Sequence, residues 1–364
     1  MKKILLAAFV AVVALTSCNK ENGLDREGQA ILISLPNATT RAIEAQVGAG
    51  ESTISASNTV IFLLNGNSVV TTDVFTTAEI SAKKKHIENV NSSVNGVLIV
   101  ANIPATNLAT VRALTSATAI RNFPYLSLSQ NSSAGVLDKL MMGEDLTLTV
   151  NPVNPVNLGT DYKEAIVELN SVTARMEIAG VIPGEGIDNI TLVSVWINNY
   201  YADAFTTTPT FHNTANSVWP TTGVGVSTGT IANPAPITYT NPEYYNAGTG
   251  SVSHGTLTPV YAYQVFAGNL PSIVMLVKGE YEAGYSPEAG KDHFLKYVTF
   301  KTYTDASNNL VTAFAANTIY KVGLTSGITV NARDLGDEPE TTMFDLGVIV
   351  SITPWTVVSV TPGV

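Results

Sequence analysis

The chain has 364 residues, 45% of them apolar and only 13% charged, so it is long and apolar enough for two domains with buried cores and is not a disordered, solvating chain. Its net charge of −10 leaves no basic field to hold a polyanion, which argues against nucleic acid as a partner. The single cysteine excludes cysteine-based zinc sites and any internal disulfide, and four histidines leave little material for a histidine-rich metal centre.

The N-terminus has the pattern of an export signal. Two lysines precede an uninterrupted apolar stretch at residues 4–15, and small residues then lead to Cys18. Such a stretch is too short to span a bilayer, which needs about 20 residues. Residues 15–18, Leu-Thr-Ser-Cys, resemble the bacterial lipobox, in which the cysteine becomes the acylated N-terminus. We therefore expect a signal peptide at residues 1–18 and lipidation of Cys18, which would hold the precursor on a membrane; a buried core cysteine is the alternative.

A short strand is expected after this signal, with Ile31, Ile33 and Leu35 projecting to one side of it. Arg41 follows in a small and polar neighbourhood, which suits an accessible loop that an Arg-specific protease could enter. A cut after Arg41 would remove residues 19–41 as a leader and separate the lipidated strand from everything downstream.

Short runs rich in β-branched and aromatic residues dominate the rest of the chain, with Gly, Pro, Asn and Thr between them. In one of them, Arg175 and Glu177 alternate with Met176 and Ile178, as in a half-buried antiparallel strand. Helical periodicity is scarce and is best at residues 107–120. This pattern predicts an all-β protein built of β-sandwiches with a minor helix in the N-terminal domain. Strands are expected at residues 59–64, 96–101, 146–150, 165–169, 174–181, 191–197, 260–266, 273–277, 295–301 and 318–324.

A domain boundary is expected at residues 151–160, which carry two prolines and a glycine between strand-like runs. It would separate an N-terminal domain at residues 42–158 from a C-terminal domain at residues 159–344. A long loop within one domain is the alternative. The turn-rich region at residues 206–255 is expected to form a surface excursion on the second domain.

The sequence offers no motif for chemistry. His86 follows three lysines, a cluster that favours a solvated charged edge over a ligand set, and the other histidines stand apart with no HxH or HExxH spacing. No GxSxG, Walker A or GxGxxG sequence opens a helix, so a nucleophile elbow or a phosphate loop has no support. The acidic run from Asp334 to Glu340 lacks the oxygen-ligand spacing of an EF-hand, which favours a solvated loop. We therefore predict no catalytic, cofactor-binding or metal-binding residue, and a protein that is not an enzyme.

The C-terminus, residues 345–364, is an apolar tail with hardly a charge. An exposed apolar strand invites pairing and must be covered. It is either the last strand of its own domain, or it fills by strand addition the site that a neighbouring copy opens when it loses its leader strand. In the second case donor and acceptor lie at opposite ends of one molecule, so the contact is heterologous and builds an open fibre. The donor side chains would be Val348, Val350, Ile352, Trp355, Val357, Val358 and Val360.

These features together resemble the fimbrillins of Bacteroidia-type (type V) pili. Besides Cys18 and Arg41, the resemblance rests on Val-Leu-Ile-Val-Ala-Asn-Ile-Pro at residues 97–104, Leu-Met-Met-Gly at 140–143, Val-Thr-Ala-Arg-Met-Glu-Ile at 172–178, Asn-Thr-Ile-Tyr-Lys-Val at 317–322 and Ile-Thr-Pro-Trp at 352–355. It implies two transthyretin-like β-sandwich domains, export as an outer-membrane lipoprotein, release of the first strand by an Arg-specific protease, and polymerisation by donor-strand exchange. It also implies identical subunits, anchor and tip fimbrial proteins as partners, no cofactor, and the role of a stalk subunit.

Other interpretations remain open at this point. A cut after Arg26 would leave the leader strand attached, and a chain that is not cut after Arg41 resembles a fimbrial anchor protein. A surface glycan-binding lipoprotein is the rival from another class. Its support is a set of loop aromatics that could stack on sugar rings, namely Trp219, Tyr239, Tyr244 and Tyr245.

Overall fold

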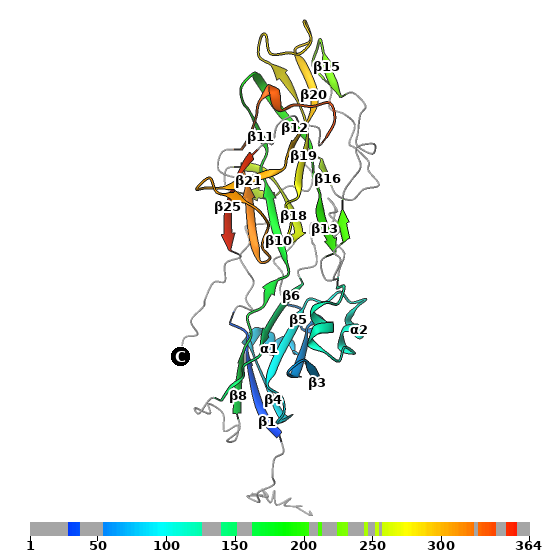
Figure 1. Cartoon of the computed structure of the whole chain (residues 1–364), viewed down its shortest axis with the longest axis vertical. Helices are drawn as coiled ribbons and strands as arrows, with labels where there is room; N and C mark the ends of the chain where they lie inside the picture. Colours follow the sequence, from blue (N-terminus) through cyan, green and yellow to red (C-terminus); the bar gives the residue numbers. More distant parts are fainter. Residues whose placement is uncertain are drawn as a thin grey trace, which may run out of the picture.

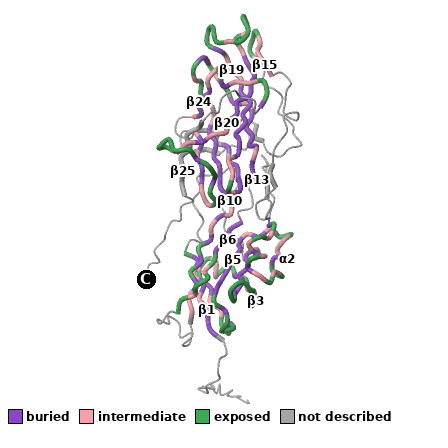
Figure 2. Tube along the Cα trace, viewed as in Figure 1, coloured by how far each residue is buried: buried purple, intermediate pink, exposed green. Residues whose placement is uncertain are grey.

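The computed structural model describes residues 28–36, 54–125, 140–150, 162–203, 210–212, 224–231, 244–246, 252–254, 257–323, 327–339 and 347–354. These segments form two bodies of β-structure arranged end to end in an elongated molecule (Figure 1). Buried residues follow the central strands of both bodies (Figure 2). No helix among the described segments has the length and apolar character needed to cross a membrane.

The first body is a sandwich of two sheets, with strand orders β4-β1-β8-β7 and β3-β2-β5-β6-β9. Three short helices and one 3₁₀ turn accompany them. The elements are β1 (Gly28–Ser34), η1 (Ala56–Asn58), β2 (Val60–Asn65), β3 (Ser68–Val74), α1 (Thr77–Ala82), β4 (Lys84–Asn91), β5 (Gly96–Ala101), α2 (Leu108–Arg112), α3 (Ala117–Arg121), β6 (Met141–Asp145), β7 (Thr149–Val150), β8 (Tyr162–Ile166) and β9 (Asn170–Ser171).

The middle strands β2, up to its exposed last residue Asn65, and β5 are apolar because both of their faces are covered. On one face Ile61 and Ile99 belong to the core between the two sheets. On the other face Phe62 and Val100 share a second core with residues of α2 and α3. A continuous apolar run, rather than alternation, is therefore what these two strands require.

The helical segment differs from the single predicted helix at residues 107–120. The structure has two short helices, α2 and α3, and the second begins at its own N-cap, where the Ser116 hydroxyl accepts a hydrogen bond from the Ala119 amide at 3.2 Å. Helix α1 was not predicted, although Thr76 and Glu79 have the spacing of a capping box.

The second body combines a seven-stranded sheet, β17-β18-β10-β23-β25-β21-β22, with a five-stranded sheet, β15-β20-β19-β12-β16, and the two-stranded ladders β11-β24 and β13-β14. Its elements are β10 (Thr173–Ile178), β11 (Val181–Pro183), β12 (Ile187–Asn198), β13 (Tyr200–Asp203), β14 (Thr210–His212), β15 (Gly225–Ser227), β16 (Tyr244–Asn246), β17 (Val252–His254), β18 (Leu257–Phe266), β19 (Ser272–Tyr281), β20 (His293–Phe300), β21 (Thr302–Asp305), β22 (Leu310–Val311), β23 (Thr318–Val322), β24 (Ile328–Val330), η3 (Ala332–Asp334) and β25 (Gly347–Pro354).

Strand β10 is buried on both faces, whereas the sequence predicted a half-buried strand. Met176 and Ile178 belong to the large core of the second body. On the opposite face Arg175 and Glu177 are 1% and 2% exposed, and the guanidinium lies 2.7 Å from the carboxylate. The charged pair is thus internal, and alternation of charge in the sequence does not mark a solvent-facing side here.

The predicted domain boundary at residues 158/159 lies too early. Strand β8 pairs with β1 and strand β9 pairs with β6, so both belong to the first body. The chain enters the second body at β10, and the Asn317 side chain, just before β23, donates to Asn170 Oδ1 at 2.9 Å across this junction. The predicted proline-rich link at residues 151–160 lies outside the described residues.

Candidate functional site

Strand β1 lies in the middle of its sheet, between two strands that come from later parts of the chain. It pairs antiparallel with β4, where Ile31 lies opposite Ile87, and parallel with β8, where Ile31 lies opposite Lys163. The predicted strand is therefore confirmed. A strand in this position has ladder hydrogen bonds on both edges, so its departure would leave β4 and β8 as two unpaired edges that face each other. We call the position between β4 and β8 the β1 site.

The inner face of β1 fills the core of the first body. Ile31, Ile33 and the following Leu35 are each 0% exposed and belong to the core cluster between the two sheets. Burial of three aliphatic side chains contributes roughly 5 to 9 kcal/mol by transfer, before ordering costs. The sequence predicted that these three residues share one side, and the structure brings them together there.

One end of the β1 site is polar. Gln29 is only 4% exposed, and its side-chain nitrogen donates to the carbonyl oxygens of Val94 at 2.7 Å and Asn91 at 3.2 Å. Lys163 of β8 also directs its ammonium to the Val94 carbonyl, at 3.4 Å. The role of Gln29 was not predicted, although a polar residue two positions before Ile31 is visible in the sequence.

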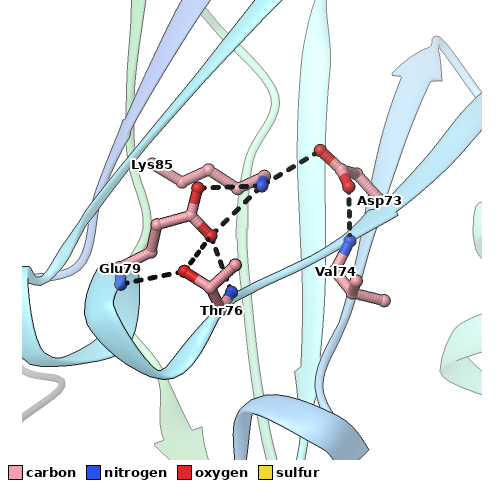
Figure 3. A network of polar contacts seen from close by, with 5 residues as sticks. All are labelled: Asp73, Val74, Thr76, Glu79 and Lys85. Atoms are coloured by element: carbon pink, nitrogen blue, oxygen red, sulfur yellow. Dashed lines mark hydrogen bonds and ion pairs between the residues drawn. The ribbon is translucent and has the colours of Figure 1, made fainter.

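Strand β4 forms one wall of the β1 site, and we call it the β4 wall. An ionic network in which β1 takes no part holds it in place (Figure 3). Lys85, opposite Ile33 in the ladder, directs its Nζ to Asp73 Oδ2 at 3.3 Å and to Glu79 Oε1 at 3.1 Å. Asp73 lies on β3 of the other sheet, so the network joins the two sheets at this edge. The sequence predicted the lysine cluster as a solvated charged edge, whereas Lys85 is 8% exposed.

Glu79 takes part in this network as a carboxylate. Partial burial acts to raise its pKa, but hydrogen bonds from the Thr76 amide and from the Lys85 ammonium outweigh burial and lower the pKa below the ordinary value of 4.5. The same carboxylate closes the capping box of α1, with the Thr76 amide at 2.6 Å from Oε2. One side chain therefore fixes both the helix and the β4 wall.

The β8 wall is held from its outer side. Strand β7 pairs with β8, and the amide of Ile166 donates to Asp145 Oδ2 at 2.9 Å. Inward-facing Ala165 and Val167 are fully buried in the core. Both walls thus have contacts of their own, besides those with β1.

The predicted donor segment is divided by the structure. Val348, Val350 and Ile352 lie in β25, which pairs parallel with β21 and antiparallel with β23. This half of the tail is therefore a strand of its own body, as the first of the two interpretations held, and not a free donor. Trp355, Val357, Val358 and Val360 lie outside the described residues, as do Cys18, Arg26 and Arg41.

The described residues offer little for metal or sugar binding. Glu280, Asp292 and His293 have ligand atoms within 4.8 Å of one another, but they lie at the surface, and His293 Nδ1 is 2.7 Å from Asp292 Oδ1. This hydrogen bond lowers the pKa of the Asp292 carboxyl. Contacts within the protein therefore account for the closeness of these side chains without a bound ligand. Of the aromatics in the glycan interpretation, Tyr244 and Tyr245 lie in β16 and pair with β12, while Trp219 and Tyr239 lie outside the described residues.

In the predicted acidic run, Asp334 and Asp337 make protein contacts. Asp334 Oδ2 accepts from both nitrogens of Asn331 at 2.8 Å, and Asp337 pairs with Lys296. The two carboxylates have structural partners, so neither needs a cation. Glu340 lies outside the described residues.

Comparison with known proteins places the fold. No family model and no curated protein matches the chain. A solved fimbrilin from Porphyromonas gingivalis W83 is 14% identical, with a TM-score of 0.52 over 92% of this chain and 99% of that one. A candidate cell adhesion protein from Parabacteroides distasonis ATCC 8503 is 13% identical, with a TM-score of 0.52 over 90% of this chain and 100% of that one. The predicted all-β sandwich fold is thereby confirmed.

Proposed function

We propose that the chain is a stalk subunit of a cell-surface fimbria, exported as a lipoprotein precursor and polymerised by protease-triggered donor-strand exchange. Its partners are identical subunits, an Arg-specific protease, anchor and tip fimbrial proteins and, through the lipid on Cys18, the outer membrane. The fold shared with a fimbrilin is consistent with this proposal but does not carry it.

The observation that carries the proposal is the position of β1. It comes first among the described strands, yet it lies between β4 and β8 in the middle of a sheet. Its covalent link to the rest of the first body runs through the segment that contains Arg41. One cut there leaves β1 held by non-covalent contacts alone, on a piece of chain that also carries Cys18.

Replacement of β1 needs a strand of matching length. Seven residues make up β1, and ten residues, 355–364, follow the end of β25 at Pro354. At about 3.3 Å per residue, such a tail extends about 33 Å and β1 about 23 Å. The tail of one copy is therefore long enough to fill the site of the next, and β25 supplies its attachment to the parent copy.

The position of the cut decides the role. A cut after Arg26 leaves β1 in place, because Arg26 precedes Gly28. A precursor that is not cut keeps both its β1 site filled and its lipid on Cys18, and acts as an anchor protein. A cut only after Arg26 keeps the site filled but removes Cys18 with its lipid. A cut after Arg41 gives the stalk subunit.

The test uses the full chain in its producing cell, with Arg41→Ala and the matched control Arg26→Ala. We expect the wild type and Arg26→Ala to give a surface protein that begins at Ala42 in mass spectra and fibres in electron micrographs. We expect Arg41→Ala to keep the acylated leader and to form no fibres. A wild-type surface protein that still begins at acylated Cys18 would overturn the proposal.

A further inference from the structure

We propose that the Val94 carbonyl makes the β1 site selective for a strand with a hydrogen-bond donor at one end. The donor is Thr356 of a second copy. Val358 and Val360 of the same strand then take the positions of Ile31 and Ile33. This inference rests on the proposed function and adds to it the register and direction of the incoming strand.

The selectivity follows from the contacts of Gln29. Val94 is 0% exposed, and its carbonyl accepts from Gln29 at 2.7 Å and from Lys163 at 3.4 Å. The neighbouring Asn91 carbonyl keeps a second donor, the Val94 amide at 3.0 Å. When β1 leaves, water can reach the Val94 carbonyl. An entirely apolar strand would cover it again with only the long contact to Lys163, and a buried acceptor without a good donor is costly.

The inner face of β1 therefore has a simple pattern in chain order: a donor, then aliphatic residues two and four positions later. Among residues 355–364 this pattern occurs only with Thr356, Val358 and Val360. Pro362 then falls at Leu35, one residue beyond the end of β1, so this register gives up one hydrogen bond, the one that the Leu35 amide donates to the Lys83 carbonyl at 2.9 Å. Threonine is shorter than glutamine, so its hydroxyl reaches the Val94 carbonyl through one water molecule. The hydroxyl is a polar partner that this water needs and that an apolar side chain at the same position does not offer.

The opposite direction fits worse. There Ser359 would take the place of Gln29 and Val357 that of Ile31, but Trp355 would fall at Ile33. Ile33 is 0% exposed in a closely packed core, and an indole in that volume would overpack it. The same direction as β1 is therefore favoured, with the incoming strand antiparallel to β4 and parallel to β8.

Fibre growth of the full chain after addition of an Arg-specific protease tests the donor. Thr356→Val keeps the shape and removes the hydroxyl, and we expect growth about tenfold slower than for the wild type. Thr356→Ser and the matched control Thr361→Val, which faces the other side of the strand, should grow at the wild-type rate. Normal growth of Thr356→Val overturns the inference but not the proposed function. Failure of the wild type to form fibres overturns both.

Cysteine pairs test the register independently, because removal of the leader also removes the one native cysteine, Cys18. Ile87 lies opposite Ile31, so Ile87→Cys combined with Val358→Cys should give a disulfide-linked ladder on non-reducing gels of fibres. Ile87→Cys with Ser359→Cys, shifted by one residue, should give none. A ladder from Ile87→Cys with Val357→Cys instead would show the opposite direction and overturn the register.

Discussion

Lys85 and Asp73 join the two sheets of the first sandwich, with Nζ 3.3 Å from Oδ2 across the edge formed by β4 and β3. The ammonium is nearly buried and also serves Glu79, so that two carboxylates depend on one lysine. This contact belongs to the wall of the β1 site and not to β1 itself. It is therefore expected to persist through any exchange of the strand.

Removal of the lysine charge should destabilise the precursor. Lys85→Met keeps the aliphatic stem but leaves Asp73 and Glu79 close together without a cation, and we expect a loss of about 1 to 2 kcal/mol in the free energy of unfolding. Urea denaturation measures it. The adjacent, exposed Lys84→Met is the matched control and should change little. Equal losses in both variants would show that the network contributes nothing specific.

The same network predicts a pH dependence. Because the folded-state pKa of Glu79 is lowered, its carboxylate adds stability at neutral pH, and this contribution is lost as the pH falls below 4.5 and through the folded-state pKa. The difference in unfolding free energy between the wild type and Glu79→Gln should therefore shrink on acidification. Urea titrations at several pH values measure this difference. A difference that is constant with pH would contradict the assigned cause.

Gly143 should tolerate no side chain. It lies in β6 within the Leu-Met-Met-Gly motif, and an added Cβ would lie 2.1 Å from the Glu168 carbonyl oxygen. The clash is with backbone, so we expect Gly143→Ala to lower the free energy of unfolding by about 2 kcal/mol or more. Gly229→Ala, where no atom lies within 4 Å, is the control. Thermal unfolding of both variants measures the loss, and equal melting temperatures for the two would contradict the prediction.

Truncation of a buried side chain on the leader strand should lower the stability of the precursor alone. Ile33→Ala removes fully buried aliphatic atoms, and we expect the precursor to lose about 2 to 5 kcal/mol. Leu32→Ala, on the half-buried outer face, should cost less. If the leader is removed as proposed, fibres grown from either variant should be as stable to heat as wild-type fibres. Destabilised Ile33→Ala fibres would show that the leader stays in the mature subunit.

Much of this architecture could be predicted from the sequence because the signals are local. The alternation of Ile31, Ile33 and Leu35 predicted β1, and the apolar run at residues 96–101 predicted β5 with the same bounds. What could not be predicted depends on partners far along the chain. The parallel pairing of β8 with β1 moved the domain boundary beyond residue 158, and no local pattern indicates which distant strand a segment will join.

The pairing of the C-terminal tail could not be predicted from the sequence for the same reason. Val348, Val350 and Ile352 have the alternation of a strand that could pair with any open edge. Whether they join their own sheet depends on the space between β21 and β23, which only the three-dimensional structure reveals. The role of Gln29 was missed for a related reason, since the carbonyls that it meets come from a turn more than 60 residues away.

The double pairing of β25 has a mechanical consequence. In a fibre linked through C-terminal tails, tension would enter each subunit at Pro354 and run along β25. Ladder hydrogen bonds lie across the strand direction, so a pull along β25 would shear the bonds to β21 and β23 together instead of opening them one after another. Strand β25, which the sequence predicted as part of the donor, would then be the element that resists separation of the subunits in a stretched filament.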